Sequence, residues 1–201
     1  MTVIGVTGPS GAGKGEVSRI LNDKYGFAVL DADKIYHSLV SSPSACLEEI
    51  RSEFGDSVIL ENGSLDRRAL SALVFGENNK EKLEILNKIT HKHVVAVIES
   101  SLNELDGATK ACVIDAPLLI EADLTQKCDV TICVLAPKGV RAARISKRDN
   151  IDNDAALKRI NSQKQDIFYI ENTDLVIMND GDISLLAIQI ERHMRERGIV
   201  I

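Results

Sequence analysis

The chain has 201 residues, 44% of them hydrophobic, which is enough for one sizeable core with a small inserted subdomain but not for two large domains. Its formal net charge of −6 at pH 7 argues against nucleic acid or an anionic membrane as a partner, because both need a basic surface. No apolar run approaches the roughly 20 residues of a membrane span, and Met1 leads into an apolar segment without a signal-peptide pattern, so we expect a cytoplasmic protein.

Short apolar segments rich in β-branched residues recur along the chain, and helical periodicity follows each of them. They span residues 3–7, 28–30, 111–114, 130–135 and, more weakly, 175–178. Continuous apolar strands separated by helices are typical of a parallel sheet that is covered on both faces. The sequence therefore predicts a doubly wound α/β fold, in a single domain over residues 1–201.

The first apolar segment runs into a glycine-rich loop, Gly-Pro-Ser-Gly-Ala-Gly-Lys, and then into a helical pattern. Glycines let the backbone turn and approach a ligand closely, so that successive N–H groups surround phosphate oxygens at a helix N-terminus. A strand, such a loop with a closing lysine, and a helix together indicate a nucleoside triphosphate site. The residues expected at its phosphates are Gly8, Ser10, Gly11, Ala12, Gly13 and Lys14, with Gly15 and Glu16 directly after them.

The residue after Lys14 departs from this motif, which has Ser or Thr there as a ligand of Mg²⁺. This chain has Gly15 and then Glu16. Mg²⁺ can still bind if phosphates and water supply most of its ligands. Glu16 could assist through water, although a carboxylate in the first turn of a helix is equally typical of an exposed residue.

Two carboxylates, Asp31 and Asp33, follow the second apolar segment. The carboxyl end of a parallel strand faces the same crevice as the phosphate loop. We expect Asp33 to deprotonate an acceptor hydroxyl and Asp31 to hold water around Mg²⁺. The alternative is that Asp33 caps the helix that begins near Lys34.

Residues 36–108 show helical patterns and turns but no convincing interior strand, which predicts a helical insertion. Helices are expected at 47–54, 67–75 and 82–105, with turns at 54–56 and 61–64. Because ligands of open α/β sheets bind beyond the carboxyl ends of the strands, this insertion is expected to bind the acceptor. It could instead serve only to cover the sheet.

A third carboxylate, Asp115, ends the apolar segment that starts at Ala111. An apolar strand that ends in Asp is the general form of a second metal-side motif in proteins with a phosphate loop. Asp115 is therefore a candidate for the Mg²⁺ side of the site, and the alternative is a turn or helix cap.

Basic residues recur on the helix predicted after the fourth strand, and three of them, Arg141, Arg144 and Arg148, share one face. Guanidinium groups over the phosphates would stabilise the charge that develops in phosphoryl transfer, and closure would exclude water. We expect residues 138–168 to form a mobile lid, with a helix at 154–168 that contains Arg159 and Gln163 as its return arm. Solvated surface charge is the alternative.

The cysteines and histidines give little sign of a further site. The cysteines lack Cys-x-x-Cys spacing, so we expect buried, reduced thiols at Cys46, Cys112, Cys128 and Cys133. His91 and His93 stand two residues apart on a predicted helix and so point to different faces. A structural transition-metal site is not expected.

Taken in this order, these motifs resemble the dephospho-coenzyme A kinase family over nearly the whole chain. The resemblance rests on the glycine loop, Asp-Ala-Asp at 31–33, Ser-Leu-Asp-Arg at 64–67, Ile-x-His at 89–91, Asp-Ala-Pro-Leu-Leu-Ile-Glu at 115–121, Arg-x-x-x-Arg at 144–148, Arg-Ile-x-x-Gln at 159–163 and Thr-Asp-x-Val-Ile-x-Asn-x-Gly at 173–181. The glycine loop is common to many NTPases, whereas the other motifs at these separations are much more specific.

The resemblance implies transfer of the γ-phosphoryl group of ATP, with Mg²⁺, to the ribose 3′-hydroxyl of dephospho-coenzyme A, on a five-stranded parallel sheet with an acceptor-binding insertion and a lid. No nucleic acid, membrane or obligate protein partner is expected. Lys14, Asp33 and Arg148 would be catalytic, and Arg144 would bind the nucleotide with the loop. The acceptor would be bound by Asp33, His37, Arg67, His91, Pro117 and Leu118.

Several positions depart from the family pattern. Gly15 and Glu16 stand in place of a Ser-Thr pair, His37 in place of Arg, Lys92 in place of Pro and Arg141 in place of Gln. The first difference bears on the metal and the second on acceptor affinity.

Two other functions fit the same residues. A kinase of nucleoside monophosphates or of another small molecule would share the loop and differ in its acceptor. A regulator that binds ATP without catalysis would fit the missing hydroxyl after Lys14.

Overall fold

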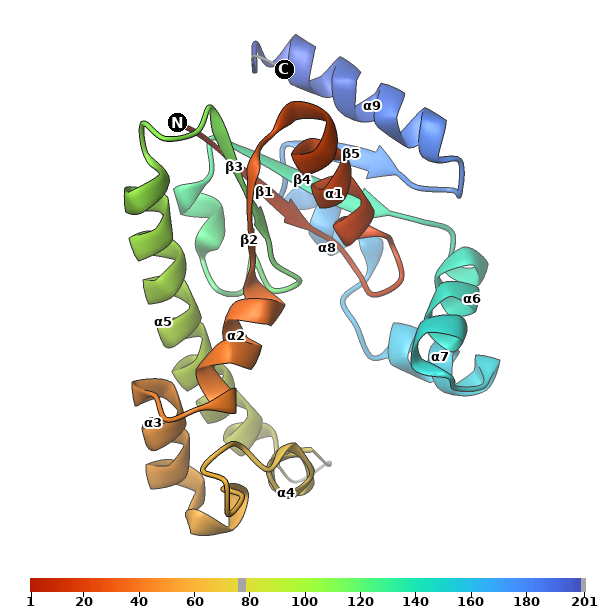
Figure 1. Cartoon of the computed structure of the whole chain (residues 1–201). Helices are drawn as coiled ribbons and strands as arrows, with labels where there is room; N and C mark the ends of the chain where they lie inside the picture. Colours follow the sequence, from red (N-terminus) through yellow and green to blue (C-terminus); the bar gives the residue numbers. More distant parts are fainter. Residues whose placement is uncertain (76–78, 200–201) are drawn as a thin grey trace. The chain divides into compact units, whose positions relative to one another are not determined.

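The computed structural model describes residues 1–75 and 79–199. In this part of the chain, five parallel strands form one sheet in the order β2-β3-β1-β4-β5, as the doubly wound prediction requires (Figure 1). The strands are β1 (Thr2–Thr7), β2 (Ala28–Asp31), β3 (Ala111–Asp115), β4 (Val130–Leu135) and β5 (Leu175–Met178). All five predicted strands are confirmed, three of them extended by one residue.

The register of the sheet brings the site-forming strand ends together. In β1, Val6 lies opposite Asp115 of β3, and Thr7 lies opposite Cys133 of β4. The glycine loop that leaves β1 therefore starts between the carboxyl ends of two neighbouring strands. In open α/β sheets this is where ligands bind.

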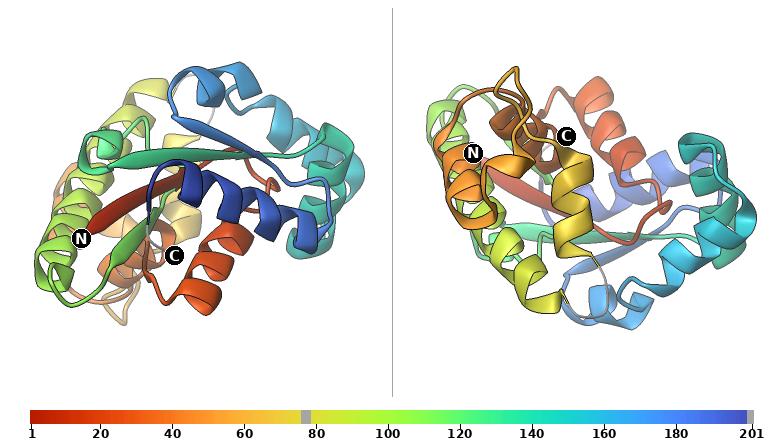
Figure 2. Two further views of the ribbon diagram at one scale, coloured as in Figure 1. Left: turned by 90° about the horizontal axis from the view of Figure 1, so that it is seen from above. Right: turned by 90° about the horizontal axis from the view of Figure 1, so that it is seen from below.

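Helices cover both faces of this sheet (Figure 2). On one face α1 (Lys14–Tyr25) packs beside α9 (Ile183–Glu196), and on the other lie η2 (Leu124–Lys127) and α8 (Asp166–Glu171). The side chains of successive β4 residues point to opposite faces of the sheet. Ile132 packs in the core with α1 and α9, and Cys133 packs near Tyr169 of α8. This alternation makes β4 apolar on every residue but one.

Residues Asp31–Ser101 form a second compact unit, separate from the unit that contains the rest of the chain. Its helices are α2 (Ala32–Ser41), α3 (Ala45–Phe54), η1 (Asp56–Val58), α4 (Arg67–Val74) and α5 (Lys80–Leu105). They enclose a core of Cys46, Leu47, Ile50, Val58, Leu70, Val74, Leu86 and Ile89. The three helices predicted in this region are present, and each lies within two residues of its predicted ends.

Short polar side chains start most of these helices, because they accept hydrogen bonds from N–H groups of the first turn that lack a helical partner. The caps of α2, α3, α4, α9 and of α7 (Asn153–Asn161) are Asp31, Ser44, Asp66, Asp182 and Asp152. The capping alternative weighed for Asp33 falls instead on Asp31, since α2 begins one residue after Asp31.

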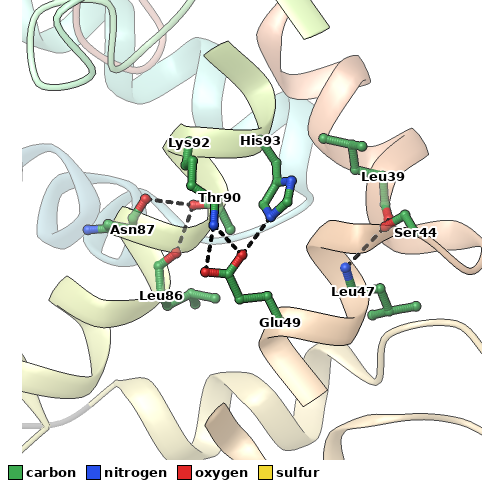
Figure 3. Close-up of polar contacts among 9 residues, drawn as sticks. All are labelled: Leu39, Ser44, Leu47, Glu49, Leu86, Asn87, Thr90, Lys92 and His93. Carbon is green, nitrogen blue, oxygen red and sulfur yellow. Dashed lines mark hydrogen bonds and ion pairs between the residues drawn. The ribbon is translucent and has the colours of Figure 1, made fainter. Parts of the chain in front are cut away.

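A charged cluster ties α5 to α3 within the second unit (Figure 3). Glu49 Oε2 accepts hydrogen bonds from Lys92 Nζ at 2.5 Å and from His93 Nε2 at 2.7 Å. The bonds from Lys92 and then His93 lower the pKa of the Glu49 carboxyl. His93 therefore has a structural partner in Glu49.

The region predicted as a lid contains α6 (Lys138–Asp149) and α7, which pack together through Ala142, Ile145, Ala156 and Ile160. The single helix predicted for 154–168 is wrong. The chain instead forms α7 and α8, separated by residues 162–165, and the side chain of Gln163 in this break accepts a hydrogen bond from the glycine loop.

None of the helices within residues 1–75 and 79–199 combines the length and the apolar character that crossing a membrane requires. Even α5, with 26 residues, carries charged side chains along its length.

We predict that the four cysteines are inert in the folded protein. Three are buried, and burial raises the pKa of Cys46 and Cys112 to about 11 and that of Cys128 to about 12. Only the thiolate attacks an alkylating reagent. Mass spectrometry after iodoacetamide at pH 8 should therefore show no modification of the native protein and four modifications in guanidinium chloride. Rapid labelling of native protein would contradict this packing.

Candidate active site at the phosphate loop

The glycine loop approaches its neighbours so closely that a Cβ atom would overlap them at its glycines, and the approach is tightest at Gly8 and Gly13. Gly8 has φ +139°, and a Cβ atom there would lie 2.2 Å from the carbonyl oxygen of Val134 in β4. Gly13 has φ +96°, and its Cβ would lie 2.1 Å from Nδ2 of Asn179. Both positions need glycine for conformation and for space.

The start of α1 suits an anion. Gly13 precedes the helix and, within the described chain, no side chain caps it, in contrast to the Asp and Ser caps elsewhere. Lys14 is the first helical residue, and its Nζ donates to the carbonyl oxygen of Gly8 at 2.9 Å. An uncapped helix N-terminus beside a lysine can accept phosphate oxygens.

Arg141 holds the loop from the side of α6. Its side chain is buried, and Nε donates to the carbonyl oxygen of Ser10 at 3.0 Å. The N–H of Ser10 donates to Oε1 of Gln163 at 3.0 Å, and Arg141 also bonds to Gln163 and pairs with Asp166 at 3.1 Å. The alternative of solvated surface charge is wrong for Arg141, because its guanidinium is buried and bonds within the protein.

A second brace consists of Arg144 and Asn179. Arg144 Nη1 donates to the carbonyl oxygens of Gly11 and Ala12 at 3.2 Å, and its Nη2 bonds to Asn179 Oδ1 at 3.1 Å. Asn179 is itself buried and donates from Nδ2 to Ala12 at 2.9 Å. Sequence reasoning assigned Asn179 no part in the site, although its position directly after β5 was a signal, since candidate residues also stand at the ends of β1, β2 and β3.

Arg148 lies near the end of α6 with an exposed side chain, bonded to Asp149 at 2.7 Å. Asp149 also accepts from Arg159 at 2.7 Å, and these arginines, Arg148 foremost, lower the pKa of its carboxyl. The catalytic role of Arg148 stays a prediction.

Asp115 lies at the end of β3, next to β1, and its Oδ2 accepts a hydrogen bond of 2.7 Å from the hydroxyl of Ser18 in α1. In residues 1–75 and 79–199, no three His, Cys, Asp or Glu side chains gather where they could hold a metal ion. Mg²⁺ commonly uses one or two carboxylates and the substrate phosphates. A single carboxylate beside the phosphate loop fits that requirement.

Gly15 and Glu16, the two residues after Lys14, make few contacts outside α1. Glu16 is half-buried in the first turn of α1 and pairs with Arg19 on the same helix. Gly15 has open space around it, since a Cβ placed there would lie more than 4 Å from every described atom beyond its chain neighbours and the adjacent backbone of α1.

A pocket of about 440 Å³ opens beside the loop, between the start of α1 and the segment from β5 to α9. It is lined by Gly13, Glu16, Arg19, Arg144, Asn179, Gly181, Ile183 and Leu186. Its volume is in the range of small-molecule sites. Ile183 and Leu186 give it an apolar wall that could contact a base.

In the second unit, three residues predicted to bind the acceptor share one region. Asp33 and His37 are exposed and lie one turn apart on α2, so they face the same side. The guanidinium of Arg67, at the start of α4, forms a hydrogen bond with His37 Nδ1. His91 is half-buried on α5.

Pro117 and Leu118 follow β3 in the first unit. The carbonyl oxygen of Pro117 accepts from the hydroxyl of Thr7, at the end of β1, and Leu118 is exposed. Their predicted contact with the acceptor stays a prediction.

The family model described as dephospho-CoA kinase matches residues 2–184 of this chain. The chain belongs to the dephospho-CoA kinase family. Its kinase activity follows from that membership, and the glycine loop is the part of the fold that such an activity requires.

Relatives in sequence and in structure agree with this. A dephospho-CoA kinase of Fusobacterium nucleatum is 38% identical over 190 residues, 94% of this chain and 95% of that protein. A crystal structure from Thermus thermophilus superposes with a TM-score of 0.81 at 27% identity, over 100% and 98% of the two chains. The dephospho-CoA kinase of Campylobacter jejuni has a TM-score of 0.60 at 28% identity, over 97% and 96%.

We predict that Arg141→Ala destabilises the dephospho-CoA kinase fold by about 2 kcal/mol, since it removes the charged hydrogen bonds of a buried guanidinium. It should also weaken ATP binding, because the carbonyl of Ser10 is no longer held. Denaturant unfolding and calorimetry with a non-hydrolysable ATP analogue measure the two effects.

Arg195→Ala is the matched control for this variant, because Arg195 pairs with Glu191 on the exposed side of α9. It should change neither quantity. Equal effects of the two substitutions would show that Arg141 does not hold the loop.

Proposed function

We propose that this chain transfers the γ-phosphoryl group of ATP to the ribose 3′-hydroxyl of dephospho-CoA, giving coenzyme A and ADP. The observation that carries this proposal is the braced phosphate loop in a chain that matches the dephospho-CoA kinase model from residue 2 to residue 184. The net charge of −6 supports a small-molecule acceptor rather than nucleic acid, acted on in the cytoplasm.

The loop would bind ATP before any acceptor. Backbone N–H groups at the start of α1 would contact the β- and γ-phosphates, and Lys14 would exchange its bond with Gly8 for a phosphate oxygen. The pocket beside Gly13 would hold the nucleoside, with its base against Ile183 and Leu186. Positioning of this kind is most of what phosphoryl transfer requires from a protein.

Mg²⁺ would be held by the ATP phosphates and by Asp115, with Asp31 in contact through water. The ion supplies positive charge to the β- and γ-oxygens when it is bound. Asp31 already caps α2 through Oδ1 and pairs with Lys34 through Oδ2 at 3.2 Å, so its share in the metal site is the smaller one.

Asp33 would act as the general base. The 3′-oxygen attacks the γ-phosphorus, the bond from phosphorus to the bridging oxygen breaks, ADP leaves with that electron pair, and the hydroxyl proton passes to the Asp33 carboxylate. His37 and Arg67 would contact the phosphates of the acceptor, with His91 completing its site. Their grouping with Asp33 in one unit supports this assignment.

Arg144 and Arg148 would stabilise the phosphates from α6. Arg144 is already fixed beside Gly11 and Ala12, so its charge is in place before the nucleotide binds. Arg148 has an exposed side chain, and an exposed arginine can reorient toward the transferring group at small cost.

An acceptor panel tests the proposed reaction. The protein is incubated with ATP, Mg²⁺ and either dephospho-CoA, a nucleoside monophosphate, shikimate or gluconate, and ³¹P NMR locates the new phosphate. We expect turnover of dephospho-CoA alone, with the phosphate on the 3′-oxygen. Turnover of a nucleoside monophosphate without dephospho-CoA would overturn the acceptor, and analogue binding without turnover of any acceptor would overturn catalysis.

We predict that Asp33→Asn lowers kcat by at least about 100-fold and leaves the KM for ATP nearly unchanged, because a general base acts on the chemical step. Steady-state kinetics with dephospho-CoA measures both constants. Asp56→Asn makes the same chemical change at an exposed residue of the same unit and should leave kcat unchanged. Near-normal turnover of Asp33→Asn would remove the residue from this role.

A further inference from the structure

Ser18 is a buried hydroxyl on α1 that faces the phosphate side of the fold. Its Oγ lies 2.7 Å from Oδ2 of Asp115 and 3.3 Å from the carbonyl oxygen of Lys14. A hydroxyl has one proton to donate, and the bond to a carboxylate is the shorter and stronger of the two. The proton of Ser18 therefore points at Asp115.

Ser18 and Gly15 lie three residues apart on α1, so they share one face of the helix. In other phosphate loops the residue after the lysine supplies a hydroxyl to Mg²⁺. Here that position is Gly15, and the space around it is open. The next hydroxyl along the face, Ser18, is the one in contact with the metal-side carboxylate.

The backbone at Asp115 is fixed independently of Ser18. Asp115 pairs with Val6 in the sheet, and the N–H of Ala116 donates to the carbonyl oxygen of Val6 at 3.1 Å. Strand pairing sets where the Cα atom of Asp115 lies, but it leaves the rotation of the carboxylate open. The bond from the Ser18 hydroxyl to Oδ2 favours one orientation of the carboxylate.

We infer that Ser18 is a positioning residue for Mg²⁺: it orients the Asp115 carboxylate in a site that lacks the hydroxyl ligand after Lys14. The inference rests on the proposed metal role of Asp115. A residue that orients a metal ligand typically contributes 10–100-fold to metal affinity. A bond that only stabilises the packing of α1 on β3 would not affect metal affinity.

Mg²⁺-dependent binding of a non-hydrolysable ATP analogue tests this inference without any acceptor or turnover. For each variant, calorimetry at a series of Mg²⁺ concentrations gives the concentration at half-maximal enhancement of analogue affinity, and EDTA gives the metal-free affinity. We expect Ser18→Ala to raise that Mg²⁺ concentration about 10-fold and to leave the metal-free affinity unchanged. Ser18→Thr keeps the hydroxyl and should remain within about 2-fold of the unmodified protein.

A double-mutant cycle with Gly15 makes the test specific. Gly15→Ser restores a hydroxyl at the open position, and in that background Ser18→Ala should change the Mg²⁺ concentration by less than about 2-fold. Gly15→Ala controls for the effect of a side chain on helix stability and should leave the cost of Ser18→Ala unchanged. If Ser18→Ala does not fold, Ser18→Cys, with a weak donor of similar size, should show the same increase in Mg²⁺ requirement.

The outcomes separate this inference from the proposals beneath it. A lower unfolding midpoint of Ser18→Ala with an unchanged Mg²⁺ requirement would make the bond purely structural and overturn the inference. An unchanged Mg²⁺ requirement in Asp115→Asn would show that Asp115 does not bind Mg²⁺, and the inference about Ser18 would then be wrong as well. Failure of dephospho-CoA as an acceptor would leave these binding measurements, and their conclusion, unaffected.

Discussion

The close approach of the glycine loop to its neighbours is the constraint on which the site depends. At Gly8 the loop backbone passes against the backbone of β4, and at Gly13 it passes against the side chain of Asn179. A Cβ atom at either position would overlap those atoms, and both residues have the positive φ that L-residues avoid. Strand β1 delivers the chain to this turn, and α1 leads it away with an uncapped N-terminus.

The loop's position also brings hydrogen-bond donors to its carbonyl oxygens. Its carbonyl oxygens, which would repel phosphate, each have a donor: Lys14 for Gly8, Arg141 for Ser10, and Arg144 for Gly11 and Ala12. The donors offset the negative ends of the carbonyl dipoles, and the arginines place positive charge around the loop, while the N–H groups of Ser10 and Ala12 bond within the protein. An acidic protein thus concentrates cations at one loop. The anion site is organised by the fold before a ligand arrives.

Much of the fold could be predicted because its signals are local. The apolar residues at 130–135 predict a buried strand. Ser44 and Asp66 begin helices because their side chains accept hydrogen bonds from N–H groups of the first turn. The glycine loop and Lys14 were equally readable, since glycine spacing and lysine position carry the chemistry. Asp115 was found from the same logic, as a carboxylate that ends a strand.

Tertiary contacts account for what the sequence did not predict. The burial of Arg141 depends on Ser10, Gln163 and Asp166, which lie up to 131 residues away along the chain. Helical periodicity could therefore place it on one face with Arg144 and Arg148 but could not show that it is buried. Gln163, which bonds to Ser10, lies in the break between α7 and α8, where one helix was expected over 154–168. The bond between Ser18 and Asp115 joins residues 97 apart, and no local pattern distinguishes Ser18 from any other helical serine.

Binding of a non-hydrolysable ATP analogue to Gly13→Ala, compared with Gly15→Ala, tests most directly whether the shape of the loop governs nucleotide binding. The two variants add the same methyl group two residues apart, one where φ is positive and Asn179 is 2.1 Å away, the other where the space is open. We expect Gly13→Ala to weaken binding by at least about 100-fold, because strain and overlap must displace the loop, and Gly15→Ala to stay within about 3-fold of the unmodified protein. Equal losses in the two variants, or none in either, would contradict this explanation.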